Sequence, residues 1–187
     1  NNFDYNAKPF RAYVAAHDLI WHTSSETESH FIDRAAHQIK SDFTYYDGPQ
    51  DRHASVLVAT RKGDCGAFSI VFASVMRLNE IPAHIWAGFR LLSFSDTAFQ
   101  PHVIAAIFVT GHGWLPVDLT SGDKVVYAMQ GDNNTIFVLH IDNGITIHPA
   151  SFGKLTCNWL QPFAFWYHGD PVTIDPSSKA EIHVSRA

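Results

Sequence analysis

Three residues that lie far apart in the sequence, Cys65, His102 and Asp118, have the side chains that a nucleophilic active site needs. A cysteine attacks a carbonyl carbon as its thiolate, a histidine accepts the thiol proton, and a carboxylate holds that histidine in the correct tautomer. Chemistry of this kind cleaves or transfers an acyl group. The three residues therefore predict a cysteine hydrolase or acyltransferase, provided that the fold brings them together.

The sequence around Cys65 is typical of the start of a helix. Gly63 and Gly66 flank Asp64 and Cys65, and an apolar run follows. Asp64 is a suitable N-cap, and the run Ala67–Leu78 predicts a helix that is apolar nearly all round and therefore buried. In the first turn, free backbone N–H groups and the helix dipole favour a thiolate. From this stretch alone, an ordinary buried cysteine is an equally good interpretation.

His102 and Asp118 are expected on neighbouring strands of one sheet. Apolar and alternating patterns predict strands over 102–109 and 114–118, joined by the bend at 111–113. Counting residues outward from the bend does not place His102 directly opposite Asp118. Strand twist, a β-bulge or a diagonal contact would have to bring the two side chains together.

The remaining segments complete a domain with helices first and strands after. Periodicity of three and four residues predicts a helix over Glu28–Phe43, and Ile81-Pro82 ends the helix that follows Cys65. The other expected elements are a helix at Ala12–Trp21, a helix or strand at Ala54–Ala59, strands at Ala83–Leu92, Val125–Met129, Thr135–Ile141 and Gly144–Ile147, an aromatic cover at Phe152–Tyr167 and a polar tail at Asp175–Ala187. The last two strands are expected to be joined by a turn at 142–144. The order predicts one α+β domain over residues 1–187, with a central nucleophile helix packed on a mainly antiparallel sheet.

Composition excludes several classes of partner. A net charge of -5 and the absence of Lys/Arg runs argue against nucleic acid, and the longest apolar windows are too short to span a membrane. The two cysteines do not form a disulfide framework, so Cys157 is expected to be a small core residue. The chain lacks an initiator Met, which indicates a mature form or a piece of a longer protein. The sequence does not determine the cellular compartment, although the cytoplasm is slightly favoured. It does not determine the oligomeric state either.

The twelve histidines do not predict a metal site. The sequence has no HExxH, no CxxC and no repeated ligand spacing, so scattered surface or core histidines are the better interpretation. We therefore expect neither a metal ion nor a cofactor.

Three segments of the sequence resemble those of a known family. KGDCGAFS, LNEIPAHIWAGF and GHGWLPVDLT, with a histidine opening a strand between the last two, are similar to the core of the transglutaminase-like superfamily, which has a papain-like Cys-His-Asp fold. The match runs from about Phe31 to Thr120. The resemblance implies that Cys65 is the nucleophile, His102 the general base and Asp118 the orienting acid. Many members carry a tryptophan two residues after the histidine, where this chain has Ile104.

The resemblance also implies a mechanism. The Cys65 thiolate would attack an amide carbonyl and form a thioester, with the oxyanion held by the Cys65 N–H and by Tyr45 or Tyr46. For both tyrosines, plain packing is the preferred interpretation. Since the family contains peptidases, amidases, crosslinking enzymes and inactive members, the leading hypothesis is a peptidase or amidase acting on a peptide or protein amide. Acyl transfer to an amine, or an inactive module that binds a peptide or partner, are the alternatives.

Overall fold

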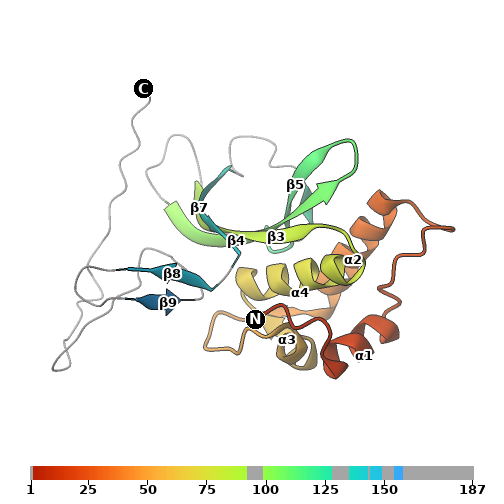
Figure 1. Ribbon diagram of the computed structural model, residues 1–187, viewed down its shortest axis with the longest axis horizontal. Helices are drawn as coiled ribbons and strands as arrows, with labels where there is room; N and C mark the ends of the chain where they lie inside the picture. The colour runs from red at the N-terminus through yellow and green to blue at the C-terminus, as the bar shows by residue number, and fades with distance from the viewer. Residues whose placement is uncertain (1, 92–98, 128–134, 143, 149–153, 158–187) are drawn as a thin grey trace.

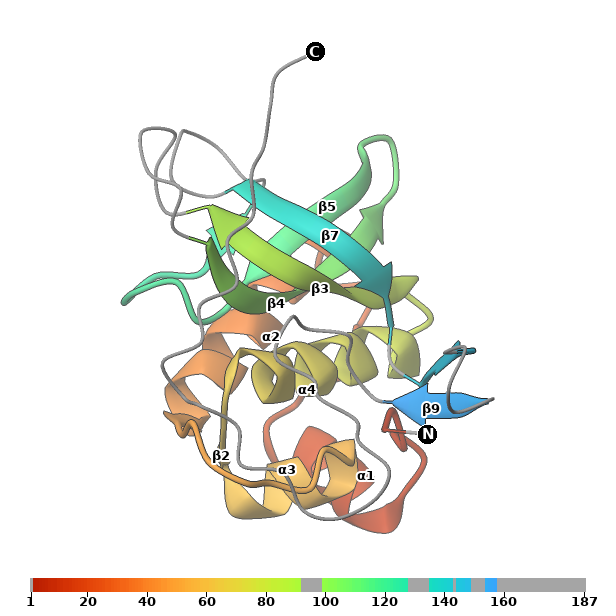
Figure 2. The same cartoon turned by 90° about the vertical axis from the view of Figure 1, so that its left-hand side faces the viewer.

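The helix that begins at Cys65 is the central element of the fold. The computed structural model describes residues 2–91, 99–127, 135–142, 144–148 and 154–157. Helix α4 (Cys65–Leu78) lies between a five-stranded sheet and a layer that contains α1 and α3, as both views show (Figures 1 and 2). This arrangement confirms the predicted α+β fold, with the nucleophile helix packed on a mainly antiparallel sheet.

Apart from two short strands that lie between the helices, the elements follow the predicted order of helices first and strands after. The helices are α1 (Lys8–Ala16), α2 (Glu28–Asp42), α3 (Ala54–Thr60) and α4. The strands are β1 (Thr44–Tyr45), β2 (Lys62–Gly63), β3 (Ala83–Leu91), β4 (Phe99–Val109), β5 (Gly113–Asp118), β6 (Val126–Tyr127), β7 (Thr135–Ile141), β8 (Ile145–Ile147) and β9 (Leu155–Cys157). The large sheet has the order β6-β5-β4-β3-β7 and every neighbouring pair is antiparallel, whereas β1 and β2 form a short parallel pair.

Local sequence signals explain the limits of α4. The side chain of Asp64 accepts a hydrogen bond from the Ala67 N–H at 3.0 Å, as an N-cap does. Every residue from Gly66 to Met76 is buried, which fits a run that is apolar nearly all round. The helix ends before Asn79, ahead of the Ile81-Pro82 pair. The predicted helix is confirmed, and it begins at Cys65 itself.

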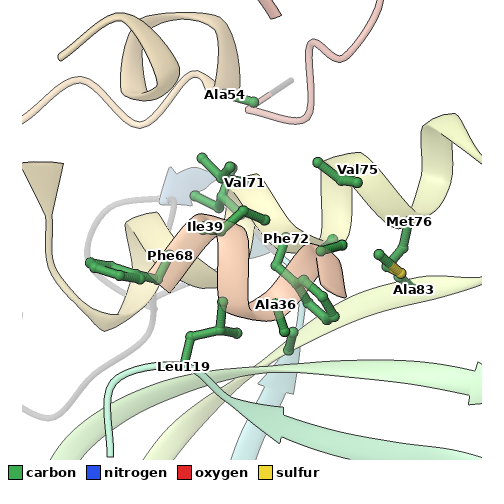
Figure 3. Close-up of a cluster of buried hydrophobic side chains, with 14 of the residues drawn as sticks. Ala36, Ile39, Ala54, Phe68, Val71, Phe72, Val75, Met76, Ala83 and Leu119 are labelled. Atoms are coloured by element: carbon green, nitrogen blue, oxygen red, sulfur yellow. The ribbon is translucent and has the colours of Figure 1, made fainter. Parts of the chain in front are cut away.

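The core lies where α4 meets α2 and the sheet. Phe68, Phe72 and Val75 of α4 pack with Ile39 of α2 and with Leu119, which follows β5 (Figure 3). All five side chains are buried, so the apolar stripe of α2 that the sequence predicted faces this core.

The first helix lies earlier in the chain than the sequence suggested. The prediction of a helix over 12–21 is wrong, because α1 begins at Lys8 and ends at Ala16. Pro9 occupies the first turn, where its fixed φ suits a helix and its missing N–H costs nothing. Asp18 then adopts a left-handed φ of 51°, which ends the helical path before Trp21.

The strand after β7 does not pair with it. The turn at 142–144 was expected to join two strands of one hairpin, but β7 pairs with β3 and β8 pairs with β9 in a separate two-stranded sheet. Figure 1 shows that small sheet apart from the large one. Segment 54–59, which the sequence left open, is helical. The predicted tail at 175–187, most of the aromatic segment 152–167 and the side chain of Cys157 lie outside the described residues.

No helix in the described segments combines the length and the apolar composition that crossing a bilayer requires.

A β-bulge in the large sheet lies beside the strand that carries His102. The register of β3 against β7 shifts between Ala87, which faces His140, and Gly88, which faces Val138. On its other side, Gly88 is the register partner of His102 in β4. Bulges of this kind often occur next to active sites, where they redirect a strand.

We expect Gly88→Ala to destabilise the protein. A Cβ at this position would lie 1.9 Å from the carbonyl oxygen of Phe137, which belongs to the backbone of β7 and cannot turn away. The strands would have to separate, at a cost of about 1–3 kcal/mol in the free energy of unfolding. Urea denaturation followed by tryptophan fluorescence measures this cost. An unchanged midpoint would show that β7 does not pack on β3 as closely as described.

Candidate active site

Cys65 lies at the edge of an open cleft. It is the first residue of α4 and is half-buried, with a free thiol. The cleft has a volume of about 440 Å³, and its walls include Tyr45, Asp47, Arg52 and Gln100. A half-buried thiol in a cleft of this size can be reached by a substrate chain.

An ion pair fixes the start of α4 beside this cleft. Arg52 donates two hydrogen bonds to Asp64, at 2.7 Å to Oδ1 and 2.5 Å to Oδ2. Bidentate pairs of this kind fix geometry as well as charge. The sequence predicted Asp64 as the N-cap, but it gave no sign of Arg52, which lies twelve residues earlier in a segment without regular structure.

His102 and Asp118 are in direct contact. The Nε2 atom of His102 lies 2.7 Å from Oδ2 of Asp118, and both residues are buried, with exposed fractions of 9% and 8%. In the β4–β5 register Ala105 faces Val117, so Asp118 lies beside Ile104, two residues from His102. The contact is therefore diagonal. The sequence left strand twist, a β-bulge or a diagonal contact as possibilities. In the structure β4 and β5 pair in regular register, and the contact is diagonal.

The second oxygen of Asp118 is also occupied. Its Oδ1 atom accepts hydrogen bonds from the Thr120 N–H at 2.8 Å and from the Thr120 hydroxyl at 3.1 Å. The carboxylate is thus held from both sides and cannot rotate away from the imidazole. The sequence analysis assigned no role to Thr120. An aspartate followed two residues later by a threonine is nevertheless a pattern in which the Asp side chain binds the backbone N–H two residues on.

The thiol of Cys65 is the other hydrogen-bond partner of the His102 side chain. Since Nε2 is bound to Asp118, Nδ1 is the nitrogen available to the sulfur. Burial by itself lowers the pKa of His102, but the hydrogen bonds to Asp118 and Cys65 and the negative charges of both outweigh it, and the pKa is raised to about 9. The three predicted residues therefore meet in space, with an imidazole that is charged at neutral pH.

The same contacts act on Asp118 in the opposite direction. Burial favours its neutral form, but the hydrogen bond and the charge of His102, together with the two hydrogen bonds from Thr120, hold the pKa of this carboxyl below its usual range. Asp118 is therefore a carboxylate at neutral pH and can only accept the proton on Nε2 of His102. When the imidazole is neutral, this contact favours the tautomer with its proton on Nε2, which leaves Nδ1 as the basic nitrogen.

The two candidate tyrosines occupy different places. Tyr45 lines the cleft with Cys65, because the parallel pairing of β1 with β2 sets Tyr45 beside Gly63, two residues before the nucleophile. Burial and the negative charges of Cys65 and of nearby carboxylates raise the pKa of Tyr45 to about 12, so its hydroxyl stays protonated. Tyr46 is not among the residues that line this cleft, and its ring lies 5.6 Å from the Nζ of Lys62.

Within the described residues, no group of three or more His, Cys, Asp or Glu side chains is arranged to hold a metal ion.

The chain was compared with known proteins. The sequence profile of the Transglutaminase-like superfamily matches residues 19–119, a range that contains all three residues of the site. Among solved structures, calcium-bound LapG of Legionella pneumophila is 16% identical, with a TM-score of 0.49 and 84% of each chain covered. No protein with a curated description matches the chain significantly.

Two further solved structures are longer than this chain. The periplasmic domain of TgpA from Pseudomonas aeruginosa is 20% identical, with a TM-score of 0.49, covering 64% of this chain and 45% of that domain. A Cytophaga hutchinsonii protein, provisionally named a cysteine protease, is 17% identical, with a TM-score of 0.45, covering 84% of this chain and 54% of its own length. This chain therefore spans about half the length of these two structures. Because the family profile covers more than half of its sequence, the chain belongs to the transglutaminase-like superfamily.

Proposed function

We propose that this protein is a cysteine-dependent enzyme that hydrolyses an amide bond of a peptide or protein. The observation that carries the proposal is the contact of the Cys65 thiol with His102, which is in turn bound to Asp118 at 2.7 Å, beside a cleft open to solvent. Family membership supports it, because superfamily members are generally cysteine-dependent enzymes.

The proposed reaction begins with attack of the Cys65 thiolate on the amide carbonyl carbon. The negative charge moves to the carbonyl oxygen, where the Cys65 N–H at the start of α4 and the Tyr45 hydroxyl are the available donors. The carbon–nitrogen bond then breaks, and the His102 imidazolium gives its proton to the departing amine. The product is a thioester on Cys65 and a neutral imidazole.

Water completes the cycle in this proposal. The neutral His102 takes a proton from water as the oxygen attacks the thioester carbonyl, and the carboxylic acid product leaves as the thiolate and imidazolium form again. Asp118 stabilises the charged imidazole in both halves of the reaction. An amine in place of water would give acyl transfer, which the same residues could perform.

The central test measures the reactivity of Cys65 and the fate of the acyl group. We expect iodoacetamide to label Cys65 faster than free N-acetylcysteine at neutral pH, and a panel of peptide amides to include substrates that are cleaved. Cys65→Ala should abolish both signals while the circular dichroism spectrum is unchanged. Mass spectrometry with and without added amine distinguishes hydrolysis from acyl transfer. Labelling no faster than that of N-acetylcysteine would refute the proposed nucleophile.

The pH dependence of amide cleavage is expected to follow the charge of His102. Since its pKa is raised to about 9, the imidazolium that protonates the leaving amine is present below that pH and is lost above it. We therefore expect kcat/KM to fall as the pH rises through about 9. Asp118→Asn removes a negative charge that raises this pKa, so the fall should shift to lower pH. A fall at the same pH in both proteins would assign it to another group.

A further inference from the structure

We propose that Ser69 is a positioning residue that sets the separation between Cys65 and His102. Ser69 lies one helical turn after Cys65 in α4 and is buried, with 2% of its surface exposed. Its hydroxyl oxygen lies 2.8 Å from the carbonyl oxygen of Cys65 and 3.2 Å from the carbonyl oxygen of Val103. Val103 is the residue directly after His102. The inference rests on the proposed function, because it concerns the geometry of the same thiol and imidazole.

The two hydrogen bonds have different consequences. A hydroxyl has one proton, so it donates to one carbonyl at a time and is shared between the two. The bond to Cys65 is local, and a serine in any helix can form it. The bond to Val103 joins α4 to β4 across thirty-four positions of the sequence. One side chain thus connects the backbone of the nucleophile to the backbone next to the base.

This connection lies where small displacements matter most. The thiol and the imidazole act on each other through a hydrogen bond and through charge. A shift of about 1 Å between catalytic groups can reduce a rate by about a hundredfold. At the helix start, the Arg52–Asp64 ion pair fixes Asp64. One turn further along the same helix, Ser69 joins the helix to β4 through its hydroxyl.

The same helix provides a matched control. Ser74 is also buried, with 0% of its surface exposed, but its hydroxyl has no hydrogen-bond partner in the described structure. Ser69→Ala and Ser74→Ala therefore remove the same atom from the same helix, and only the first removes a connection to the site. A loss of function that follows from stability alone would affect both variants.

The test compares alkylation of Cys65 by iodoacetamide at neutral pH in the full chain and its variants. We expect the second-order rate constant to fall about tenfold in Ser69→Ala, to stay within about twofold in Ser74→Ala, and to recover largely in Ser69→Thr, which keeps the hydroxyl. The high-pH fall in amide cleavage should also shift to lower pH in Ser69→Ala only, because a displaced thiolate no longer raises the pKa of His102. A purely structural role would not move this profile.

Each result separates the inference from the proposed function. If wild-type Cys65 reacts no faster than N-acetylcysteine, the proposed function fails and the role of Ser69 fails with it. If wild-type Cys65 reacts rapidly and Ser69→Ala matches Ser74→Ala in both rate and pH profile, only the role of Ser69 is overturned. If Ser69→Ala does not fold, Ser69→Thr decides: a folded threonine variant with the reactivity of wild type supports the role, and one that reacts slowly overturns it.

Discussion

Replacing His102 with alanine is expected to lower kcat/KM for an amide substrate by about 10³–10⁴, the largest functional effect of a single substitution outside Cys65. The variant loses both the positive charge that stabilises the thiolate and the proton donor for the leaving amine. Alkylation of Cys65 at neutral pH should slow as well, because the sulfur then loses its hydrogen-bond partner. Steady-state kinetics and iodoacetamide labelling measure the two effects separately.

The control for this prediction is a histidine at the far end of the β4–β5 hairpin. His112 lies in the turn between β4 and β5 and is exposed, so His112→Ala should leave both rates unchanged. Equal activity of the two variants would rule out His102 as the general acid and base. Activity lost together with the folded state, seen by circular dichroism, would instead show that His102 acts on stability.

Phe72→Ala is expected to cause a large loss of stability. Phe72 lies in the middle of α4 with 0% of its surface exposed, and Figure 3 shows it among the side chains of α2 and α4 above the sheet. Removing a buried phenyl ring forfeits its transfer free energy and leaves a cavity, which costs about 3–5 kcal/mol in the free energy of unfolding. Small domains are stable by about 5–15 kcal/mol, so the variant would be near its limit. Urea denaturation measures the loss.

An exposed phenylalanine gives the matched comparison for this loss. Phe137 of β7 has 61% of its surface exposed, so Phe137→Ala should change the free energy of unfolding by less than about 0.5 kcal/mol. Similar losses in the two variants would mean that α4 is not the centre of the core. Reduced labelling of Cys65 in Phe72→Ala should recover at lower temperature, because it would follow from partial unfolding.

Much of the fold could be predicted because its signals are local. Asp64 as an N-cap, the apolar run after Cys65 and the Ile81-Pro82 pair define α4, and each acts over a few residues. The bend at 111–113 likewise fixed the pairing of β4 with β5. The position of α1 was predicted less well: the apolar residues suggested a helix over 12–21, whereas α1 begins at Lys8 with Pro9 in its first turn.

The turn at 142–144 shows where local signals are insufficient. Its residues suit a hairpin, yet β7 pairs with β3 and β8 pairs with β9. Asp142 accepts hydrogen bonds from Arg77 at 2.8 Å and from the Ile85 N–H at 3.1 Å. These contacts hold the end of β7 against α4 and β3. A strand's partner depends on which edge is available after the core has packed, and the turn residues do not contain that information.

The sequence by itself determined the residue types of the site, the helix that begins at Cys65 and the adjacent strands of His102 and Asp118, because caps, turns and periodicity are encoded within short segments. Only the tertiary structure decided that the His102–Asp118 contact is diagonal, that Tyr45 and not Tyr46 lines the cleft, and that Thr120 and Ser69 connect to the site. Each of these depends on strand register and on the position of α4 against β4. Register and helix position are set by the packing of the whole core, so no short segment specifies them.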